Sequence, residues 1–344
     1  MSAAETHMKR EIAEIPAATA RFLDRGMPAV ADAAATLRAL DPDLLVTVAR
    51  GSSDHAAAYL KYAVELLAGV PVASVGPSVA SVYRRQLRMG RAAAIGISQS
   101  GQSPDIVEMM HAAGAGGALG IAITNSEGAP ISGVSAHTLS LHAGPEHSVA
   151  ATKTFVASVV AGLALLAEWQ DDAELRAAVA GLPEAFAAAL ACDWSALADR
   201  LVRADRAFVL GRGPGFAIAA EMALKCKETC DLHAESYSAA EVLHGPSALV
   251  KTRFPVLALG VEDAALPHVI ETAERLAAQG ADVFLTGPWP ARGVVNLPAV
   301  PGGHGLTAPL VVAVSFYAFA EALARRRGLN PDTPPNLRKV TATV

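Results

Sequence analysis

The most constraining feature of the sequence is a buried apolar run that ends in a cluster of hydroxyls and a glycine. Residues 92–97 are apolar, Ser98-Gln99-Ser100-Gly101 follows directly, and Pro104 stands where a helix would begin. A strand that leads through a polar turn into a helix N-terminus presents unsatisfied N–H groups and the positive end of the helix dipole. The stretch therefore predicts an anion-binding turn, although a serine-rich turn that only caps a helix has the same pattern.

Similar turns occur twice more, and they indicate the fold class. Residues 44–48 lead into Gly51-Ser52-Ser53, and residues 207–210 lead into Gly211-Arg212-Gly213. Apolar runs alternate with helical patterns along the chain, which is typical of a parallel, doubly wound α/β sheet whose ligands bind beyond the carboxyl ends of the strands. We therefore expect two tandem copies of one α/β unit. The expected strands are 44–48, 70–75, 92–97, 120–123, 138–141, 207–210, 255–259, 282–285 and 294–297. The expected later helices are 149–168, 171–202, 216–228, 266–279 and 306–328.

Charge and composition narrow the function classes. The net charge is −5 and no basic run occurs, which argues against nucleic acid and anionic membranes as partners. The first ten residues lack the apolar core of a signal peptide, and runs such as 156–166 are short for a membrane span, so we expect a cytoplasmic protein. The three cysteines, Cys192, Cys226 and Cys230, match neither a zinc pattern nor a disulfide framework. We expect them to be core residues, and we expect no metal and no cofactor.

The densest polar block is residues 221–246. Glu221, Lys225 and Glu228 fall on one helical face, which could be a solvated salt-bridge stripe or the lining of a pocket. A carboxylate held near a lysine can move a proton if burial tunes its pKa. His233 and His244 are expected in the loop that follows, where His244-Gly245-Pro246 would form a rigid turn suited to presenting an imidazole.

Together these motifs resemble the sugar-isomerase (SIS) phosphosugar-binding family in two copies. More closely, the chain is similar to the isomerase half of the glutamine–fructose-6-phosphate aminotransferases, through residues 8–12, Val149-Ala150-Ala151-Thr152-Lys153 and residues 336–341. The resemblance implies two tandem SIS domains, each a parallel sheet flanked by helices in a flavodoxin-like three-layer α/β sandwich. The implied division is a helical segment at 1–40, SIS domains at 41–185 and 186–328, and an active-site tail at 329–344.

The resemblance also implies roles for individual residues. Glu228 would move a proton between C1 and C2 of an open-chain sugar, and Lys225 and Glu221 would lie around the same site. His244 would open the sugar ring from the neighbouring subunit, so a homodimer is implied. Lys339 would engage the sugar carbonyl from a mobile tail that excludes water. The implied substrate-binding residues, which include a phosphate cradle, are Ser52, Ser53, Ser98, Gln99, Ser100, Ser103, Val149 and Ala150.

The chain departs from the family pattern at three places. Arg50 stands where the family has cysteine, Ile15 where it has glutamine, and Arg338 where a small residue precedes the tail lysine. The last position would lie near the point of ammonia delivery.

The sequence also begins at the isomerase region, without the catalytic cysteine of a glutamine-hydrolysing domain. We therefore expect a deaminase/isomerase that converts glucosamine 6-phosphate to fructose 6-phosphate and ammonium. A fructosamine-6-phosphate deglycase or a galactosamine-6-phosphate deaminase would use the same groups. A phosphosugar sensor without turnover is the alternative of a different class.

Overall fold

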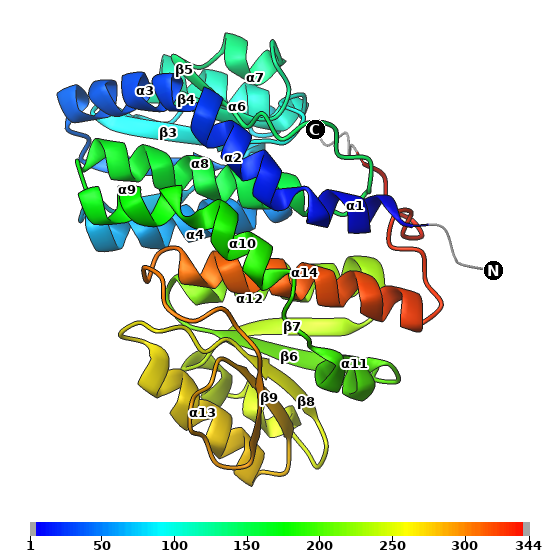
Figure 1. Cartoon of the computed structure of the whole chain (residues 1–344). Coiled ribbons are helices and arrows are strands. Elements are labelled where there is room, and N and C mark those ends of the chain that lie inside the picture. The colour runs from blue at the N-terminus through cyan, green and yellow to red at the C-terminus, as the bar shows by residue number, and fades with distance from the viewer. Residues whose placement is uncertain (1–4, 340–344) are drawn as a thin grey trace. The chain divides into compact units, whose positions relative to one another are not determined.

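The structure, a computed structural model, describes residues 5–339 and divides into two compact units (Figure 1). Unit 1 contains the chain up to Glu14, the short segment His147–Thr152, and Leu182–Leu337. Unit 2 contains Ile15–Glu146, Lys153–Gly181, and the last described residues, Arg338 and Lys339. The chain therefore crosses from one unit to the other several times, and the predicted domain boundaries remain predictions.

Unit 2 is built on a five-stranded parallel sheet with the order β2-β1-β3-β4-β5. Its central strands are apolar on both faces, as parallel sheets covered on both sides require. In β3, for example, all six residues are buried. The strands are β1 (Leu44–Val48), β2 (Val72–Ser74), β3 (Ala92–Ile97), β4 (Leu119–Thr124) and β5 (His137–Ser140).

Helices cover both faces of this sheet. On one face α3 (Met27–Leu40), α4 (Ser52–Leu67) and α8 (Lys153–Trp169) pack together, with α2 (Ile15–Arg25) and α9 (Ala173–Ala180) against α8. On the other face α6 (Pro104–Ala115) packs against β3 and β4 and contacts α5 (Ser78–Ser81) and α7 (Pro130–Gly133). The unit is therefore a three-layer α/β sandwich.

Unit 1 repeats the architecture with the sheet order β10-β9-β8-β6-β7, again all parallel. Read from its other edge, this order is β7-β6-β8-β9-β10, which matches β2-β1-β3-β4-β5 strand for strand. The prediction of two copies of one α/β unit is thus confirmed. The strands are β6 (Arg206–Gly211), β7 (His233–Ser238), β8 (Pro255–Ala258), β9 (Asp282–Thr286) and β10 (Val294–Leu297).

The helices of unit 1 also form two layers. In Figure 1, α12 (Pro214–Cys230) and α14 (Ala308–Arg326) lie on one face of the sheet, and α13 (Leu266–Ala278) lies on the other. α14 is long and apolar enough to span a membrane, but most of it is buried in the core, so its apolar character is explained by packing. The remaining elements are α1 (His7–Ala13), α10 (Leu182–Ala189), α11 (Ser195–Leu201), and the 3-10 helices η1 (Glu241–Leu243) and η2 (Pro246–Leu249).

Three expectations about secondary structure were wrong. The helix expected over 171–202 is three separate helices, α9, α10 and α11, and Gly181 ends the first of them. His233 does not lie in a loop, because it begins β7, an edge strand of polar composition that pairs only with β6. The helix expected from Val149 begins only at Lys153. The backbone N–H groups of His147 and Ser148, which precede this segment, donate to the side chain of Glu11.

Candidate functional site

The serine turn of unit 2 is fixed by hydrogen bonds at the carboxyl end of β3. The Ser98 N–H donates to the carbonyl of Ile123 in the next strand (3.1 Å), and the Gly101 N–H donates to Ser98 Oγ (3.1 Å). The carbonyl of Gln99 accepts from the Asn125 N–H (3.1 Å). The turn is therefore rigid before any ligand binds.

Gly101 is required at the base of this turn for two reasons. Its φ is +61°, in the left-handed region that favours glycine. A Cβ there would also lie 2.6 Å from the Ala129 Cβ and 2.9 Å from the Ile131 Cγ2. The backbone of the serine turn thus packs closely on the loop that follows β4.

The turn leaves several polar side chains available for a ligand. Ser103 is the N-cap residue of α6, but its side chain makes no capping hydrogen bond. Ser52 and Ser53 open α4 from the neighbouring strand β1, and the N-cap of that helix is Gly51. Within residues 5–339, the side chains of Ser52, Ser53, Gln99 and Ser103 have no hydrogen-bond partner, and all four are partly buried. Unused donors beside two helix N-termini form a site suited to an anion.

The predicted acidic face of α12 is buried in unit 1. Glu221 is fully buried and Lys225 is 1% exposed, so the alternative of a solvated salt-bridge stripe is wrong. The Lys225 ammonium lies 3.5 Å from Glu221 Oε1 and also forms an ion pair with Glu228. The Tyr317 hydroxyl of α14 donates to Glu221 Oε1 at 3.0 Å. Burial of an ammonium requires such partner carboxylates, and here they hold the head of Lys225 beside Glu228.

Glu228 is the member of this face that reaches solvent. Its side chain is 22% exposed and lines a pocket of about 530 Å³ at the C-terminal end of α12. The root of the C-terminal tail forms the other wall of the pocket, from Leu329 to Leu337. Glu228 is thus a carboxylate with an ammonium behind it and an open cavity in front, an arrangement suited to proton transfer.

His244 lies directly after η1, and its side chain is exposed in the single chain. Its ring has no partner within the described residues, and Leu249 on the adjoining η2 is 56% exposed. This segment therefore presents an imidazole and an apolar side chain outward.

The segment around Val149 and Ala150 is held by residues far away in sequence. The Glu11 carboxylate of α1 accepts hydrogen bonds from the His147 N–H and the Ser148 N–H. The Val149 N–H donates to the carbonyl of Asp332 at 3.1 Å. These contacts replace the i to i−4 hydrogen bonds of a helix, so the helix predicted from Val149 starts later.

Asp332 ties the tail to the N-terminal helix of unit 1. Its two carboxylate oxygens accept from the N–H groups of His7 and Met8, each at 2.8 Å. The same residue therefore caps α1 through its side chain and holds Val149 through its carbonyl. Glu11 and Asp332 were not identified from sequence, and no local pattern marks them.

Lys339 pairs with a buried carboxylate within unit 2. Its ammonium lies 2.9 Å from Glu146 Oε2, and Glu146 also accepts from Thr154 N (3.0 Å) and Thr154 Oγ1 (2.6 Å). Burial alone would raise the pKa of Glu146, but the Lys339 ammonium and the Thr154 hydrogen bonds outweigh it and hold that pKa below its ordinary value. Glu146 thus caps α8 and fixes the tail lysine, a role that the sequence did not reveal.

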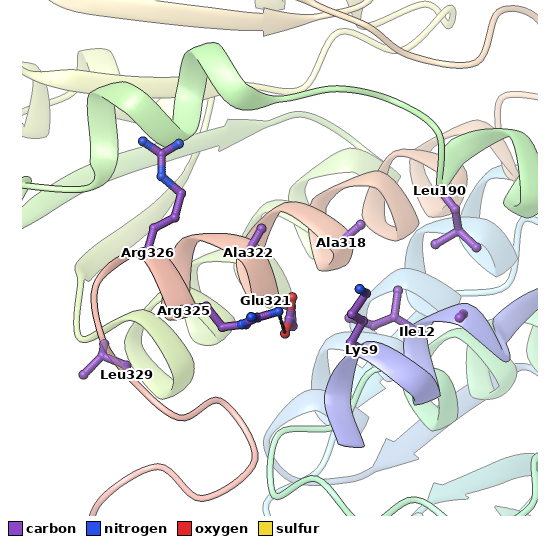
Figure 2. Close-up of a pocket in the computed structure, with 10 residues that line it drawn as sticks. Lys9, Ile12, Leu190, Ala318, Glu321, Ala322, Arg325, Arg326 and Leu329 are labelled. Atoms are coloured by element: carbon purple, nitrogen blue, oxygen red, sulfur yellow. Dashed lines mark ion pairs between the residues drawn. The ribbon is translucent and has the colours of Figure 1, made fainter. Parts of the chain in front are cut away.

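A second pocket in unit 1 contains none of the predicted site residues. It has a volume of about 810 Å³ and lies between α1 and α14 (Figure 2). Its cations are already paired: Arg325 faces Glu321 (3.9 Å), Arg326 lies 2.7 Å from Asp199, and Lys9 lies 3.8 Å from Glu5. This pocket offers little charge to a ligand.

The three cysteines differ in burial. Cys226 and Cys230 are buried, as expected of core residues, whereas Cys192 is partly exposed. Burial raises the pKa of the Cys230 thiol to about 11 and that of Cys226 well above its ordinary value, so neither is a thiolate near neutral pH. Residues 5–339 contain no cluster of three or more histidine, cysteine or acidic side chains placed to hold a metal ion.

The predicted residues divide between the two units. The serine turn, Ser52, Ser53 and Lys339 belong to unit 2, and Glu221, Lys225, Glu228, His244, Val149 and Ala150 belong to unit 1, where Glu221, Lys225 and Glu228 are in mutual contact.

Comparison with known proteins gives a consistent result. A family model described as SIS domain matches residues 41–168 and 200–286. The chain is 35% identical over 318 residues to a glutamine–fructose-6-phosphate aminotransferase [isomerizing] of Aeropyrum pernix, which covers 87% of this chain and 51% of that protein. The chain thus spans about half the length of the curated relatives it matches.

Two solved structures are similar over nearly the whole chain. A candidate phosphosugar isomerase from Silicibacter pomeroyi DSS-3 is 55% identical with a TM-score of 0.92, covering 95% of this chain and 100% of that one. The C-terminal domain of glucosamine-fructose-6-phosphate aminotransferase from Francisella tularensis is 25% identical with a TM-score of 0.86, covering 96% and 99%.

Proposed function

The chain belongs to the SIS domain family, and we propose that it is an amino-sugar phosphate deaminase/isomerase. The proposed reaction converts glucosamine 6-phosphate and water to fructose 6-phosphate and ammonium. The observation that carries the proposal is Glu228, a partly exposed carboxylate that lines a cavity and is held by the buried Lys225.

Glu228 is assigned the proton transfer. In the open-chain sugar it removes the proton from C2 and returns a proton to C1, while the amine nitrogen gives up one proton and the C1 oxygen takes one up, so that the aldehyde becomes an alcohol and an imine is left at C2. Water then adds to the imine carbon, and the C–N bond breaks to release ammonia, which takes up a proton from solvent. Lys225 keeps Glu228 oriented and offsets its charge while the proton is absent.

The serine turn is assigned the phosphate. Backbone N–H groups and hydroxyls at the N-termini of α4 and α6 can donate to phosphate oxygens without adding charge to the chain. In this assignment the ligand's phosphate contacts Ser52, Ser53, Ser98, Gln99, Ser100 and Ser103, and Val149 and Ala150 contact the sugar.

His244 and Lys339 complete the proposed machinery. The exposed His244 imidazole is assigned to ring opening in the partner subunit of a homodimer, which the exposed Leu249 beside it supports. Lys339, on the tail, is assigned to the sugar carbonyl, and Glu146 holds it in place before the substrate binds.

The names of the relatives support a hexose 6-phosphate that carries an amino group. The relatives are named as aminotransferases of fructose 6-phosphate and described as isomerizing. Their names therefore combine transfer of an amino group with isomerisation of the sugar, and the proposed reaction runs these two changes in reverse. Galactosamine 6-phosphate and fructosamine 6-phosphates are the alternative substrates, and a phosphosugar sensor without turnover is the alternative of another class.

The test is an assay of ammonium and fructose 6-phosphate after purified protein is mixed with glucosamine 6-phosphate in the absence of glutamine. Equal amounts of both products from the wild type, and none from Glu228→Gln, are expected. If only galactosamine 6-phosphate or a fructosamine 6-phosphate gives product, the assigned substrate is wrong and the assigned mechanism stands. Tight binding of all three compounds without turnover would overturn the proposal of an enzyme and favour a phosphosugar sensor.

A further inference from the structure

A cation, Arg50, lies in the turn that follows the neighbouring strand β1 and contacts α6, the helix that follows the serine turn. β1 and β3 pair in parallel up to Val48 opposite Gly96, and Arg50 and Ser98 each follow that last pair by two residues. Adjacent strands lie about 4.8 Å apart. In the order β2-β1-β3-β4-β5 the chain turns in opposite directions from β1 and from β3, so this is the switch point at which doubly wound sheets bind ligands.

The guanidinium of Arg50 is fixed along one edge. Its Nε and Nη2 donate to Asp105 Oδ2 at 2.9 and 2.7 Å, and Asp105 is fully buried in the first turn of α6. The side chain of Arg50 nevertheless remains 50% exposed. A guanidinium has five N–H donors, and Nη1 of Arg50 has no partner within residues 5–339. An arginine anchored by a buried acid, with one edge open, is pre-organised for a second anion.

The local charges show why such a cation is needed. Asp105 opens α6, and Asp54 lies in the first turn of α4, so each helix N-terminus at the turn carries a carboxylate. Burial raises the pKa of Asp54, while the charges of His55 and Arg50 act in the opposite direction. Two carboxylates would repel a phosphate dianion, and Arg50 pairs with Asp105 and also acts electrostatically on Asp54.

We propose that Arg50 binds the substrate phosphate directly through its open Nη1 edge, and that Asp105 is its positioning residue. This inference rests on the proposed phosphosugar function and adds a charged contact to a cradle otherwise made of neutral donors. Arg50 therefore sets the preference of the site for a dianionic phosphate over an uncharged sugar end.

The chain contains a matched control for this proposal. Arg212 precedes Gly213 in unit 1 as Arg50 precedes Gly51 in unit 2, and the two glycines have nearly the same backbone conformation. In the described part of the chain, Arg212 has no carboxylate within ion-pair distance. Its unit also has no serine turn after β8. Arg212→Gln should therefore leave phosphate binding unchanged.

The experiment measures the affinity of the full chain for inorganic phosphate by calorimetry or by phosphorus NMR. Arg50→Gln is expected to weaken binding by roughly ten- to a hundredfold, the effect of a hydrogen bond to a charged group. Ser98→Ala serves as the test of the cradle itself. The double variant Arg50→Gln/Asp105→Asn removes the ion pair without leaving a buried charge, so it guards against misfolding of the single variant.

The outcomes separate the possibilities. Weak binding by both Arg50→Gln and the double variant, with Arg212→Gln normal, supports a direct contact. Recovery of wild-type affinity in the double variant overturns it, because Arg50 would then only neutralise Asp105. If Ser98→Ala weakens binding and Arg50→Gln does not, the Arg50 contact fails while the cradle stands. If the wild type does not bind phosphate, both the cradle and the contact fail.

Discussion

The two units share one strand order but carry different chemistry at equivalent places. The turn after β1 and the turn after β6 both pass through a glycine in a rare conformation, with φ/ψ of 55°/−133° at Gly51 and 59°/−136° at Gly213. The turns after β3 and β8 differ completely. Unit 2 has Ser98-Gln99-Ser100, whereas unit 1 has Leu259-Gly260-Val261 followed by Glu262-Asp263.

The turn after β8 has a backbone N–H group that is not free for an anion. The Asp263 carboxylate accepts from the Ala265 N–H at 2.8 Å, and burial raises its pKa. The chain's own acid thus occupies an N–H group before α13 that an external anion could otherwise use. The same strand order thus carries hydroxyls in the turn of unit 2 and acids in the turn of unit 1.

The helices that follow β1 and β6 differ in the opposite sense, because here unit 1 has charged residues where unit 2 has apolar or aromatic ones. Counted from Gly213, the residues Glu221, Lys225 and Glu228 occupy the positions that Tyr59, Ala63 and Leu66 occupy when counted from Gly51. Tyr59 and Ala63 are fully buried, as Glu221 and Lys225 nearly are. The fold therefore buries the first two positions in both units, and the residue types decide whether they form apolar packing or a charged pair, whereas at the third position Leu66 is 66% exposed and Glu228 only 22%.

The largest effect is expected from Glu228→Gln. The amide keeps the shape of the side chain but cannot accept a proton, so kcat should fall by roughly a hundred- to ten-thousandfold. Phosphate affinity should not change, because phosphate binding is assigned to unit 2. Glu65→Gln on α4, the equivalent helix, is the control and should retain full activity. Equal losses in kcat and in phosphate affinity would contradict this division of labour.

A large stability effect is expected at Lys225. Lys225→Met leaves the Glu221 carboxylate buried without its ammonium partner, which should cost about 3–5 kcal/mol of unfolding free energy in a urea titration. Lys61→Met is the control, since the Lys61–Glu65 pair of α4 is about a third exposed and should contribute about 1 kcal/mol or less. Similar losses at the two lysines would show that the α12 network is solvated.

Smaller losses of stability are expected when glycines with positive φ are replaced by alanine, and their size should depend on the space around each glycine. Gly101→Ala combines a positive φ with contacts shorter than 3 Å and should destabilise the chain by roughly 2–4 kcal/mol. Gly51→Ala and Gly213→Ala have the same unusual conformation but open space around a Cβ, so each should cost about 1–3 kcal/mol. The two should be equal, and a clear difference in their melting temperatures would refute structural equivalence of the turns.

The smallest effect concerns the tail of unit 2 and depends on pH. The pKa of Glu146 is below its ordinary value of 4.5, so the Lys339–Glu146 pair contributes fully above that value and is lost as the pH falls through the lower, folded-state pKa. Glu146→Gln should weaken tail docking by roughly 1.5–3 kcal/mol at neutral pH and remove this dependence. Hydrogen exchange of the tail backbone between pH 3 and about 6 would measure it, with Glu65→Gln as the surface control.

The sequence patterns predicted most strands and turns well because each of these elements depends on residues that are close together in the chain. An apolar run followed by serines and a proline specifies a strand, a turn and a helix start within fifteen residues, and β3 has the predicted bounds. The polar strand His233–Ser238 was missed for the same reason. Its sequence lacks an apolar signal, and only its place at the edge of the sheet beside β6 makes it a strand.

The sequence by itself determined two parallel sheets, their turns, and the residue types that could bind a phosphate or move a proton. Only the tertiary structure decided which charges are buried and paired. Lys339 meets Glu146 across 193 residues, and Glu11 meets His147 across 136. No local periodicity encodes such pairs. They form because burying a carboxylate costs free energy unless a donor pairs with it, and in this fold the carboxylate and its donor come from distant parts of the chain.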